Sequence, residues 1–211
     1  MTETKQLDRI IEFHGHMCPG LAMGIRAAEA ALDNIGPHSS DEEVVAIVET
    51  DMCGVDAIQF MTGCTFGKGN LVHQDYGKNA YTFIRRSDGK AVRLSARPGG
   101  WGQRTSELES LLGKVGTRTA TPEERQRFSE LQKERTKHIL GAALDELYDV
   151  REVDVEAPRP ARIHASIPCE SCGEPTMETR IRRLDGRELC PPCFDQALSG
   201  TVRVSAPSRR G

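Results

Sequence analysis

The sequence contains no long apolar run, and its first residues do not have the pattern of a secretory signal. None of its apolar stretches reaches the roughly 18 residues that a membrane-spanning helix needs. Residues 1–8, MTETKQLD, have neither the basic start nor the apolar centre of a signal peptide. We therefore expect a protein that does not enter a membrane and that resides in the cytoplasm, where thiols stay reduced. The cysteines are then expected to be metal ligands or catalytic groups rather than disulfides.

The sequence also lacks a block of like charge long enough to form a strong nucleic-acid footprint. The charges are nevertheless divided unevenly. Residues 1–157 carry 19 Lys and Arg against 25 Asp and Glu, a net charge of −6. Residues 158–211 carry nine Arg, no Lys and six acidic residues, a net charge of +3. The basic end favours a solvated surface that uses arginine, with contact to nucleic acid or to an acidic partner protein as the alternative.

The chain has the length of one medium-sized domain with a small appendage. Its hydrophobic periodicity, caps and turn residues predict two helices, a strand, a helix, a hairpin of two strands and two further helices. The predicted helices cover residues 5–13, 19–34, 55–62, 104–113 and 121–148, and the predicted strands cover residues 44–48, 80–86 and 90–97. This order predicts an α+β fold: a two-layer core with helices on one face of a small mixed sheet, followed by a helical extension.

Composition and motifs divide the chain into four parts. Residues 1–157 are predicted to form the α+β core with its C-terminal helices. Residues 158–166, which include two prolines, are predicted to be a linker. Residues 167–197 hold four cysteines and are predicted to form a small separate domain. Residues 198–211 are predicted to be a disordered tail.

Four cysteines near the C-terminus have the spacing of a structural zinc site. Cys169, Cys172, Cys190 and Cys193 read C-x2-C-x17-C-x2-C, and two C-x2-C turns supply the four thiolates that tetrahedral Zn²⁺ takes. Between the pairs we expect a hairpin whose first strand covers residues 177–183. Because such a small module has almost no apolar core, Zn²⁺ would supply much of its folding free energy. We predict a zinc-ribbon-like finger that resembles the four-cysteine finger of DksA/TraR-type proteins, with a redox dithiol pair as the alternative.

A second group of cysteines and histidines lies in the first third of the chain. His14, His16 and Cys18 lie within five residues of one another, just before a predicted helix, and Cys53 lies just before another. Exposed N–H groups at a helix start stabilise a thiolate. His16, Cys18 and Cys53 are therefore predicted to hold Zn²⁺ or another transition metal with one position open. The alternative is a helix-start motif with Cys53 as a small buried residue. Cys64 is a fourth ligand, a redox partner of Cys53 or a buried residue.

Several neighbouring side chains are candidates for acid–base and charge roles. His14 is predicted to act either as a general acid or base or as a group that supports a metal ligand. Asp51 and Asp56 flank the cysteine cluster and are suited to orienting a histidine or serving as a base. Lys68 lies in a glycine-rich loop that departs from the phosphate-loop motif. We expect Lys68 to offer its charge to an anionic substrate. The candidate catalytic residues are thus His14, Asp51 and Lys68.

Three segments together resemble a known protein family. Residues 13–24 read FHGHMCPGLAMG, residues 51–59 read DMCGVDAIQ and residues 62–71 read TGCTFGKGNL. In this order they are similar to the FmdE family, which is named for the E subunit of formylmethanofuran dehydrogenase. The resemblance covers about residues 7–97 and the helices behind them, and members of the family often carry a C-terminal zinc finger.

The resemblance implies a two-layer α+β core of the type shared with a domain of glyceraldehyde-3-phosphate dehydrogenase. It implies a metal bound by the His16–Cys18 and Cys53 motifs, and a homodimer in which N-terminal helices are exchanged. It does not imply the reaction of the namesake complex, since the chain lacks a ferredoxin-type cysteine run for iron–sulfur clusters.

Two functions follow as hypotheses. The first is a metal-binding enzyme, such as an oxidoreductase subunit, or an accessory subunit linked to formylmethanofuran dehydrogenase and to one-carbon or molybdenum/tungsten metabolism. The second is a regulatory protein without catalysis, whose zinc finger contacts a partner protein or nucleic acid.

Overall fold

The structure is a computed structural model that describes residues 3–37, 43–102 and 105–199. It contains two compact units, Met1–Ala161 and Arg162–Gly211, and the boundary between them in the sequence falls within the predicted linker. In the part of the chain that is described, no helix combines the length and the apolar character that crossing a membrane requires.

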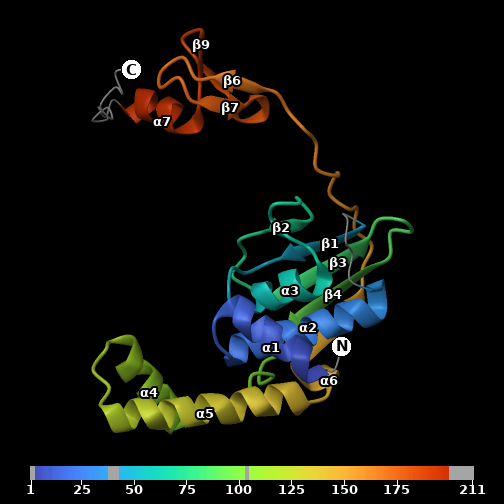
Figure 1. Cartoon of the computed structure of the whole chain (residues 1–211), viewed down its shortest axis with the longest axis vertical. Coiled ribbons are helices and arrows are strands. Elements are labelled where there is room, and N and C mark those ends of the chain that lie inside the picture. Colours follow the sequence, from blue (N-terminus) through green and yellow to red (C-terminus); the bar gives the residue numbers. More distant parts are fainter. Residues whose placement is uncertain (1–2, 38–42, 103–104, 200–211) are drawn as a thin grey trace. The chain divides into compact units, whose positions relative to one another are not determined.

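A five-stranded mixed sheet forms the centre of the first unit (Figure 1). Its strands are β1 (Val44–Val48), β2 (Leu71–His73), β3 (Ala80–Arg85), β4 (Ala91–Ala96) and β5 (Tyr148–Glu152). They lie in the order β2-β1-β3-β4-β5. β1 and β2 are parallel, whereas the other neighbouring strands are antiparallel. The predicted mixed sheet and its hairpin are confirmed.

Alternate side chains of the strands enter two different apolar clusters. Val44, Ala46 and Val48 of β1 belong to the main core on the helix side, whereas Val45 belongs to a smaller cluster on the opposite face. This alternation follows from the period of two in an extended strand. Apolar surroundings on both faces explain why the whole of β1 is apolar, and the strand predicted for residues 44–48 is confirmed.

The chain after β5 covers part of the second face. Val153 and Ala157 pack against the cluster that contains Val45, and the Arg86 guanidinium donates a hydrogen bond to the carbonyl oxygen of Pro158. The first residues of the predicted linker therefore pack as part of the first unit.

Helices α2 (Pro19–Ile35) and α3 (Gly54–Thr62) lie on the other face of the sheet, and α1 (Glu3–His14) packs against α3 (Figure 1). α2 matches its predicted span, with proline in its first turn. The chain itself buries most of α2, so its apolar composition does not require a partner chain. The homodimer stays a prediction.

α2 and α3 approach each other closely because each has a glycine at their contact. A Cβ on Gly24 would lie 2.2 Å from the carbonyl oxygen of Gly54, and a Cβ on Gly54 would lie 2.7 Å from the Tyr81 hydroxyl oxygen. Only glycine fits at such separations. One turn earlier, a Cβ on Gly20 would lie 3.1 Å from the Cβ of Cys53. The glycine contact therefore places the N-terminal ends of α2 and α3 side by side.

A helical hairpin forms the predicted extension. α4 (Ser106–Gly116) and α5 (Pro122–Gly141) pack against each other, and α5 also packs against α2. Thr121 caps α5, and the Glu124 side chain accepts a hydrogen bond from the Thr121 backbone N–H in return. This reciprocal pair is a capping box, and it begins the helix where the sequence predicted its start.

The helix predicted for residues 121–148 ends early, and the prediction is wrong beyond α5. Ala142 is extended, a short helix α6 (Leu144–Leu147) follows, and Tyr148 begins β5. Apolar Tyr148 and Val150 alternate with charged residues, which is the period of a strand. Pairing with β4 satisfies this segment's backbone groups and buries Tyr148.

The second unit is a set of short elements around four cysteines. It contains β6 (Ser166–Pro168), β7 (Pro175–Met177), the 3-10 helix η1 (Glu178–Arg180), β8 (Arg182–Leu184), β9 (Arg187–Leu189) and α7 (Pro191–Ser199). The strand predicted for residues 177–183 is divided by η1, so it joins two hairpins, β6–β7 and β8–β9. Residues 198 and 199 are helical, and the rest of the predicted tail lies outside the described residues.

Candidate metal centres

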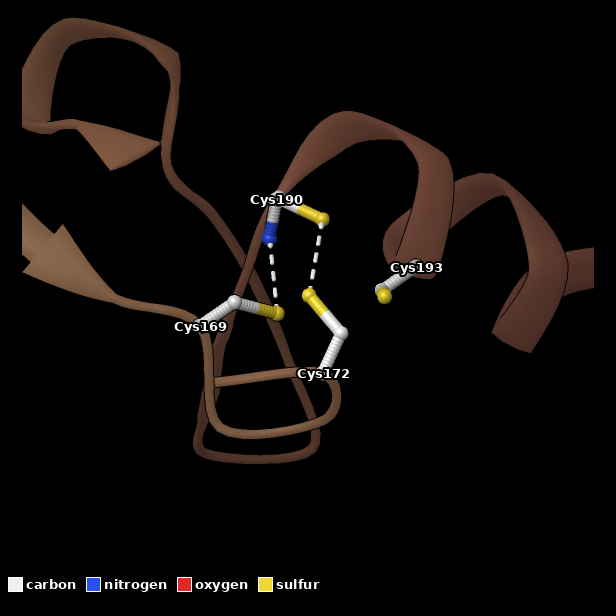
Figure 2. A group of neighbouring side chains, drawn as sticks. All are labelled: Cys169, Cys172, Cys190 and Cys193. Carbon is white, nitrogen blue, oxygen red and sulfur yellow. Dashed lines mark hydrogen bonds between the residues drawn. The ribbon is translucent and has the colours of Figure 1, made fainter. Parts of the chain in front are cut away.

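The four C-terminal cysteines converge on one point (Figure 2). Cys169 and Cys172 lie in the turn after β6, Cys190 follows β9 and Cys193 lies in the first turn of α7. Their sulfur atoms all lie within 4.8 Å of one another, and the sulfurs of Cys172 and Cys190 are 3.8 Å apart. A tetrahedron with Zn–S bonds of about 2.3 Å has sulfur atoms about 3.8 Å apart. The arrangement therefore fits Zn²⁺.

The backbone around these cysteines stabilises negative sulfur. The N–H groups of Ser171 and Cys190 point at the sulfur of Cys169, at 3.5 and 3.2 Å. Burial alone would raise the pKa of Cys169, but hydrogen bonds from the backbone of Cys172, Cys190 and Ser171 and from the Cys172 side chain lower it to about 6. A hydrogen bond from the Glu174 backbone lowers the pKa of Cys172, but desolvation and the neighbouring cysteines raise it to about 12, because thiolates without a cation repel one another. Zinc binds thiolates rather than thiols, so a bound Zn²⁺ would offset this repulsion.

In the first unit, His14 lies between a carboxylate and a thiol. Its Nδ1 is 2.7 Å from Oδ2 of Asp56, in the first turn of α3, and its Nε2 is 4.0 Å from Sγ of Cys18. When Nδ1 donates its hydrogen to Asp56, the lone pair of Nε2 is free to bind a metal. Gly15 has a left-handed φ of 98°, and His16 follows. One ligand atom each of His14, His16 and Cys18 lies within 4.8 Å of the others.

Cys18 and Cys53 lie at the starts of neighbouring helices. Cys18 is the N-cap of α2, and its sulfur accepts a hydrogen bond of 3.3 Å from the Leu21 N–H. The sulfurs of Cys18 and Cys53 both lie within 4 Å of the position that a Cβ on Gly20 would occupy. Burial, followed by the neighbouring Cys18, raises the pKa of Cys53. Cys53 does not belong to the group of His14, His16 and Cys18, whose ligand atoms all lie within 4.8 Å of one another. Its sulfur lies beside that of Cys18, and a bound cation would offset the repulsion between two thiolates, so Cys53 is a candidate for a further ligand.

Cys64 lies elsewhere. The nine residues of α3 separate it from Cys53, and at about 1.5 Å per residue they span about 14 Å. A disulfide needs Cα atoms within about 7 Å of each other. The thiol of Cys64 is fully buried and donates a hydrogen bond of 3.3 Å to the Val44 carbonyl oxygen. Burial raises its pKa. The structure therefore brings Cys64 neither to the cluster as a ligand nor to Cys53 as a redox partner.

The cysteine pair opens on a cleft of about 1070 Å³ within the first unit. Cys18 and Cys53 line one side of it, and Trp101, in the loop that follows β4, lines another. Arg135 of α5 also lines the cleft, and its Nε donates a hydrogen bond of 3.1 Å to the Trp101 carbonyl oxygen. The helical extension thus forms part of a cavity that begins at the candidate metal ligands.

The charged groups at the cleft are not those predicted from the sequence. Among the described residues, Asp51 and Lys68 do not line it, whereas Lys78 and Arg97 do. Lys78 lies just before β3 and Arg97 just after β4, and the antiparallel pairing of these strands brings their ends together. The predicted hairpin contained this information, because its register places residues on either side of it next to each other.

Comparison with known proteins identifies both parts of the chain. The family model described as "FmdE, Molybdenum formylmethanofuran dehydrogenase operon" matches residues 13–149. The model described as "Prokaryotic dksA/traR C4-type zinc finger" matches residues 162–197. The resemblances proposed from the sequence motifs are confirmed.

Two individual proteins are similar over most of the chain. A curated protein of Archaeoglobus fulgidus, "Probable S-adenosyl-L-methionine-binding protein", is 36% identical over 197 residues, which cover 90% of this chain and 52% of that protein. The chain therefore spans about half the length of this relative. The crystal structure of an FmdE-like protein of the tungsten formylmethanofuran dehydrogenase kind, from Syntrophus aciditrophicus, aligns with a TM-score of 0.60 and 26% identity, covering 90% of this chain and 91% of that one.

Proposed function

The chain belongs to the FmdE family, and on this premise we propose that it is a metal-dependent enzyme or accessory subunit of one-carbon or molybdenum/tungsten-linked metabolism. Its core site would hold a transition metal through His14, His16, Cys18 and Cys53, with a fifth coordination position open to a ligand from the cleft. The four-cysteine finger would hold a structural Zn²⁺. The cysteines of the core site line a large cleft, from which a further ligand could reach the metal.

The observation that carries the proposal is the His14–Asp56 contact beside Cys18. Imidazoles that ligate metals commonly donate their other ring N–H to a carboxylate, which fixes the ring and strengthens the ligand. Here Asp56 accepts from Nδ1 of His14, while Nε2 faces the Cys18 sulfur. A borderline cation such as Zn²⁺ suits a set of imidazole and thiolate ligands. When bound, it would act as a Lewis acid toward a group in the cleft.

Metal content tests this site directly. We expect Cys18→Ser to lower the metal content of the purified protein from two ions per chain to one, since the described residues contain two candidate clusters. Serine is a good N-cap, so this substitution keeps a cap on α2 while removing a thiolate. Cys53→Ala is expected to cause the same loss by removing the other thiolate. Elemental analysis of the full-length chain measures both.

Cys64→Ala is the matched control, because it removes a cysteine that the structure places outside the cluster. It should retain both metal ions. An unchanged metal content in Cys18→Ser and Cys53→Ala would eliminate the core site and leave the finger as the metal-binding part.

The carboxylate that contacts His14 has a separate expected effect. Asp56→Asn should weaken metal binding at the core site about 10- to 100-fold. The amide oxygen can still accept the hydrogen bond from Nδ1 of His14, but it lacks the negative charge that makes the imidazole a stronger ligand. Competition with a chromophoric chelator measures the affinity, and the finger provides an internal standard. Asp33→Asn on α2 is a control of the same chemistry. Equal affinities for both variants would contradict the role of Asp56.

The name of the Archaeoglobus relative raises S-adenosylmethionine as a ligand. That molecule carries a sulfonium, an ammonium and one carboxylate, so its net charge is positive. Lys78, Arg97 and Arg135 line the cleft, and no Asp or Glu is among the described residues that do so. The charge of the cleft therefore opposes this ligand, and the relative's name belongs to a protein about twice as long as the matched region.

The alternative function is a regulatory protein whose finger contacts a partner and whose core metal is structural. The C4-type finger favours this alternative, because such modules fold around their metal without themselves supplying a reaction. Metal exchange separates the two functions. A site with an open position exchanges its ion under mild chelation and takes up an added ligand, whereas a closed site retains its ion.

A further inference from the structure

We infer that the cleft binds an organic anion in which a flat ring is joined to a carboxylate or a phosphate. The inference rests on the proposed function in that it names the kind of molecule that would meet the core metal. The inference rests on three features of the cleft: its cationic side chains, the indole of Trp101 and the start of α2.

The charge of the cleft is opposite to that of the body around it. Residues 1–157 have a net charge of −6, yet the charged side chains among the described lining residues are Lys78, Arg97 and Arg135. These cations come from three separate segments: the start of β3, the end of β4 and α5. Cations gathered around one cleft add their fields there. A ligand with negative charge is therefore favoured against the general charge of the surface.

The cations differ in how firmly they are held. Arg135 donates hydrogen bonds to two neutral oxygens, the Trp101 carbonyl at 3.1 Å and the Gln132 amide at 3.1 Å. Arg97 is exposed and forms no ion pair with the described residues. Arg135 thus supports the wall of the cleft, while the Arg97 guanidinium is available to a carboxylate or phosphate, which its planar donors match.

The aromatic surface is Trp101, whose loop is fixed on both sides. Gly99 and Gly102 have left-handed φ values of 89° and 77°, and a Cβ on Gly100 would lie 2.7 Å from the Leu147 carbonyl oxygen. The loop therefore packs directly against the chain before β5 and holds the indole at the cleft. An indole face offers a ring of the ligand an apolar, polarisable surface.

The volume of the cleft and the residues of α2 that line it also agree with a ligand of this kind. Pockets for small molecules commonly measure about 300–1,000 Å³, and this cleft reaches about 1070 Å³. It is therefore far larger than an inorganic anion requires. Pro19 and Gly20, in the first turn of α2, line it as well. The partial positive charge of this helix start adds to the charge of the side chains.

Trp101 is the single tryptophan of the chain, so its fluorescence reports on the cleft. The full-length protein is titrated with adenosine monophosphate and with its uncharged counterpart adenosine, and likewise with nicotinate and nicotinamide. Saturable changes in tryptophan emission are expected for at least one anion, with its neutral counterpart at least about tenfold weaker, since a charged hydrogen bond contributes about a factor of ten. The pair that shows the difference tells a phosphate ligand from a carboxylate ligand.

Arg97→Gln is expected to weaken binding of the responding anion about tenfold, whereas Arg125→Gln, on the part of α5 away from the cleft, should leave it unchanged. Equal binding of each anion and its neutral counterpart, or no response to any of the four at millimolar concentration, would overturn the inference. So would equal affinities of the two arginine variants. The metal content of the same samples is measured in parallel, so a missing core metal and a missing anion site are distinguished.

Discussion

Replacement of Cys190 by serine is expected to unfold the second unit while the first unit keeps its stability. Apart from cysteines, the apolar cluster of this unit contains Leu189 as its one buried residue among those described. Leu184 and Phe194 are partly buried and pack against it. Such a cluster cannot offset the entropy of ordering about 35 residues. Binding of structural Zn²⁺ contributes about 10–16 kcal/mol in isolated fingers, so loss of one thiolate removes most of the folding free energy.

Amide hydrogen exchange measures this result unit by unit. In Cys190→Ser, amides of β6 to α7 should exchange at the rate of an unfolded chain, while amides of the five-stranded sheet keep their protection. Ser171→Ala, inside the first cysteine pair, leaves every thiol and backbone donor in place and should retain the protection. Protected finger amides in zinc-free Cys190→Ser would show that apolar packing alone folds this unit.

The second large effect is expected from Gly24→Ala, which should lower the free energy of unfolding of the first unit by about 2–3 kcal/mol. The added Cβ would lie 2.2 Å from the Gly54 carbonyl oxygen. Because the opposing atom belongs to the backbone, no rotamer change relieves the contact, and α2 must move away from α3. This cost exceeds the gain of about 1 kcal/mol that alanine usually brings to a helix interior. Urea unfolding followed by circular dichroism measures the difference.

Gly113→Ala in α4 is the matched control, since nothing lies within 4 Å of its added Cβ. It should stabilise the protein by up to about 1 kcal/mol. Movement of α2 also carries Cys18 away from Cys53, so Gly24→Ala should lower the core metal content as well. A Gly24→Ala protein with wild-type stability and metal content would contradict the proposed helix contact.

The parts of the fold that were predicted correctly depend on local rules. Pro19 at a helix start, the Thr121 capping box and the turn at Ser87–Gly89 each concern residues close in sequence. β5 was missed because Leu147 and the apolar residues before it continue the helical pattern of α5. The strand that follows exists because β4 offers a free edge, and only the assembled sheet provides that partner.

In the candidate site, too, local features could be predicted from the sequence, whereas tertiary contacts could not. Cys18 and Cys53 were predicted to bind one metal because a helix start stabilises each thiolate, but the glycines that bring those helices together have no distinctive sequence signal. The Asp56 carboxylate was named as a possible partner of a histidine, and the packing of α1 on α3 selects His14. Lys68 was chosen by its nearness in sequence to the cysteine motifs, whereas strand pairing places Lys78 and Arg97 at the cleft.

The chain that follows β5 has a consequence for how such proteins combine modules. The FmdE family match ends at residue 149, but Val153 and Ala157 still cover the outer face of the sheet. The compact units divide between Ala161 and Arg162, and the finger match begins at residue 162. A recombination event that added or removed a finger could cut the gene at this codon boundary without exposing the sheet. The same cut placed a few codons earlier would leave an apolar face open to aggregation.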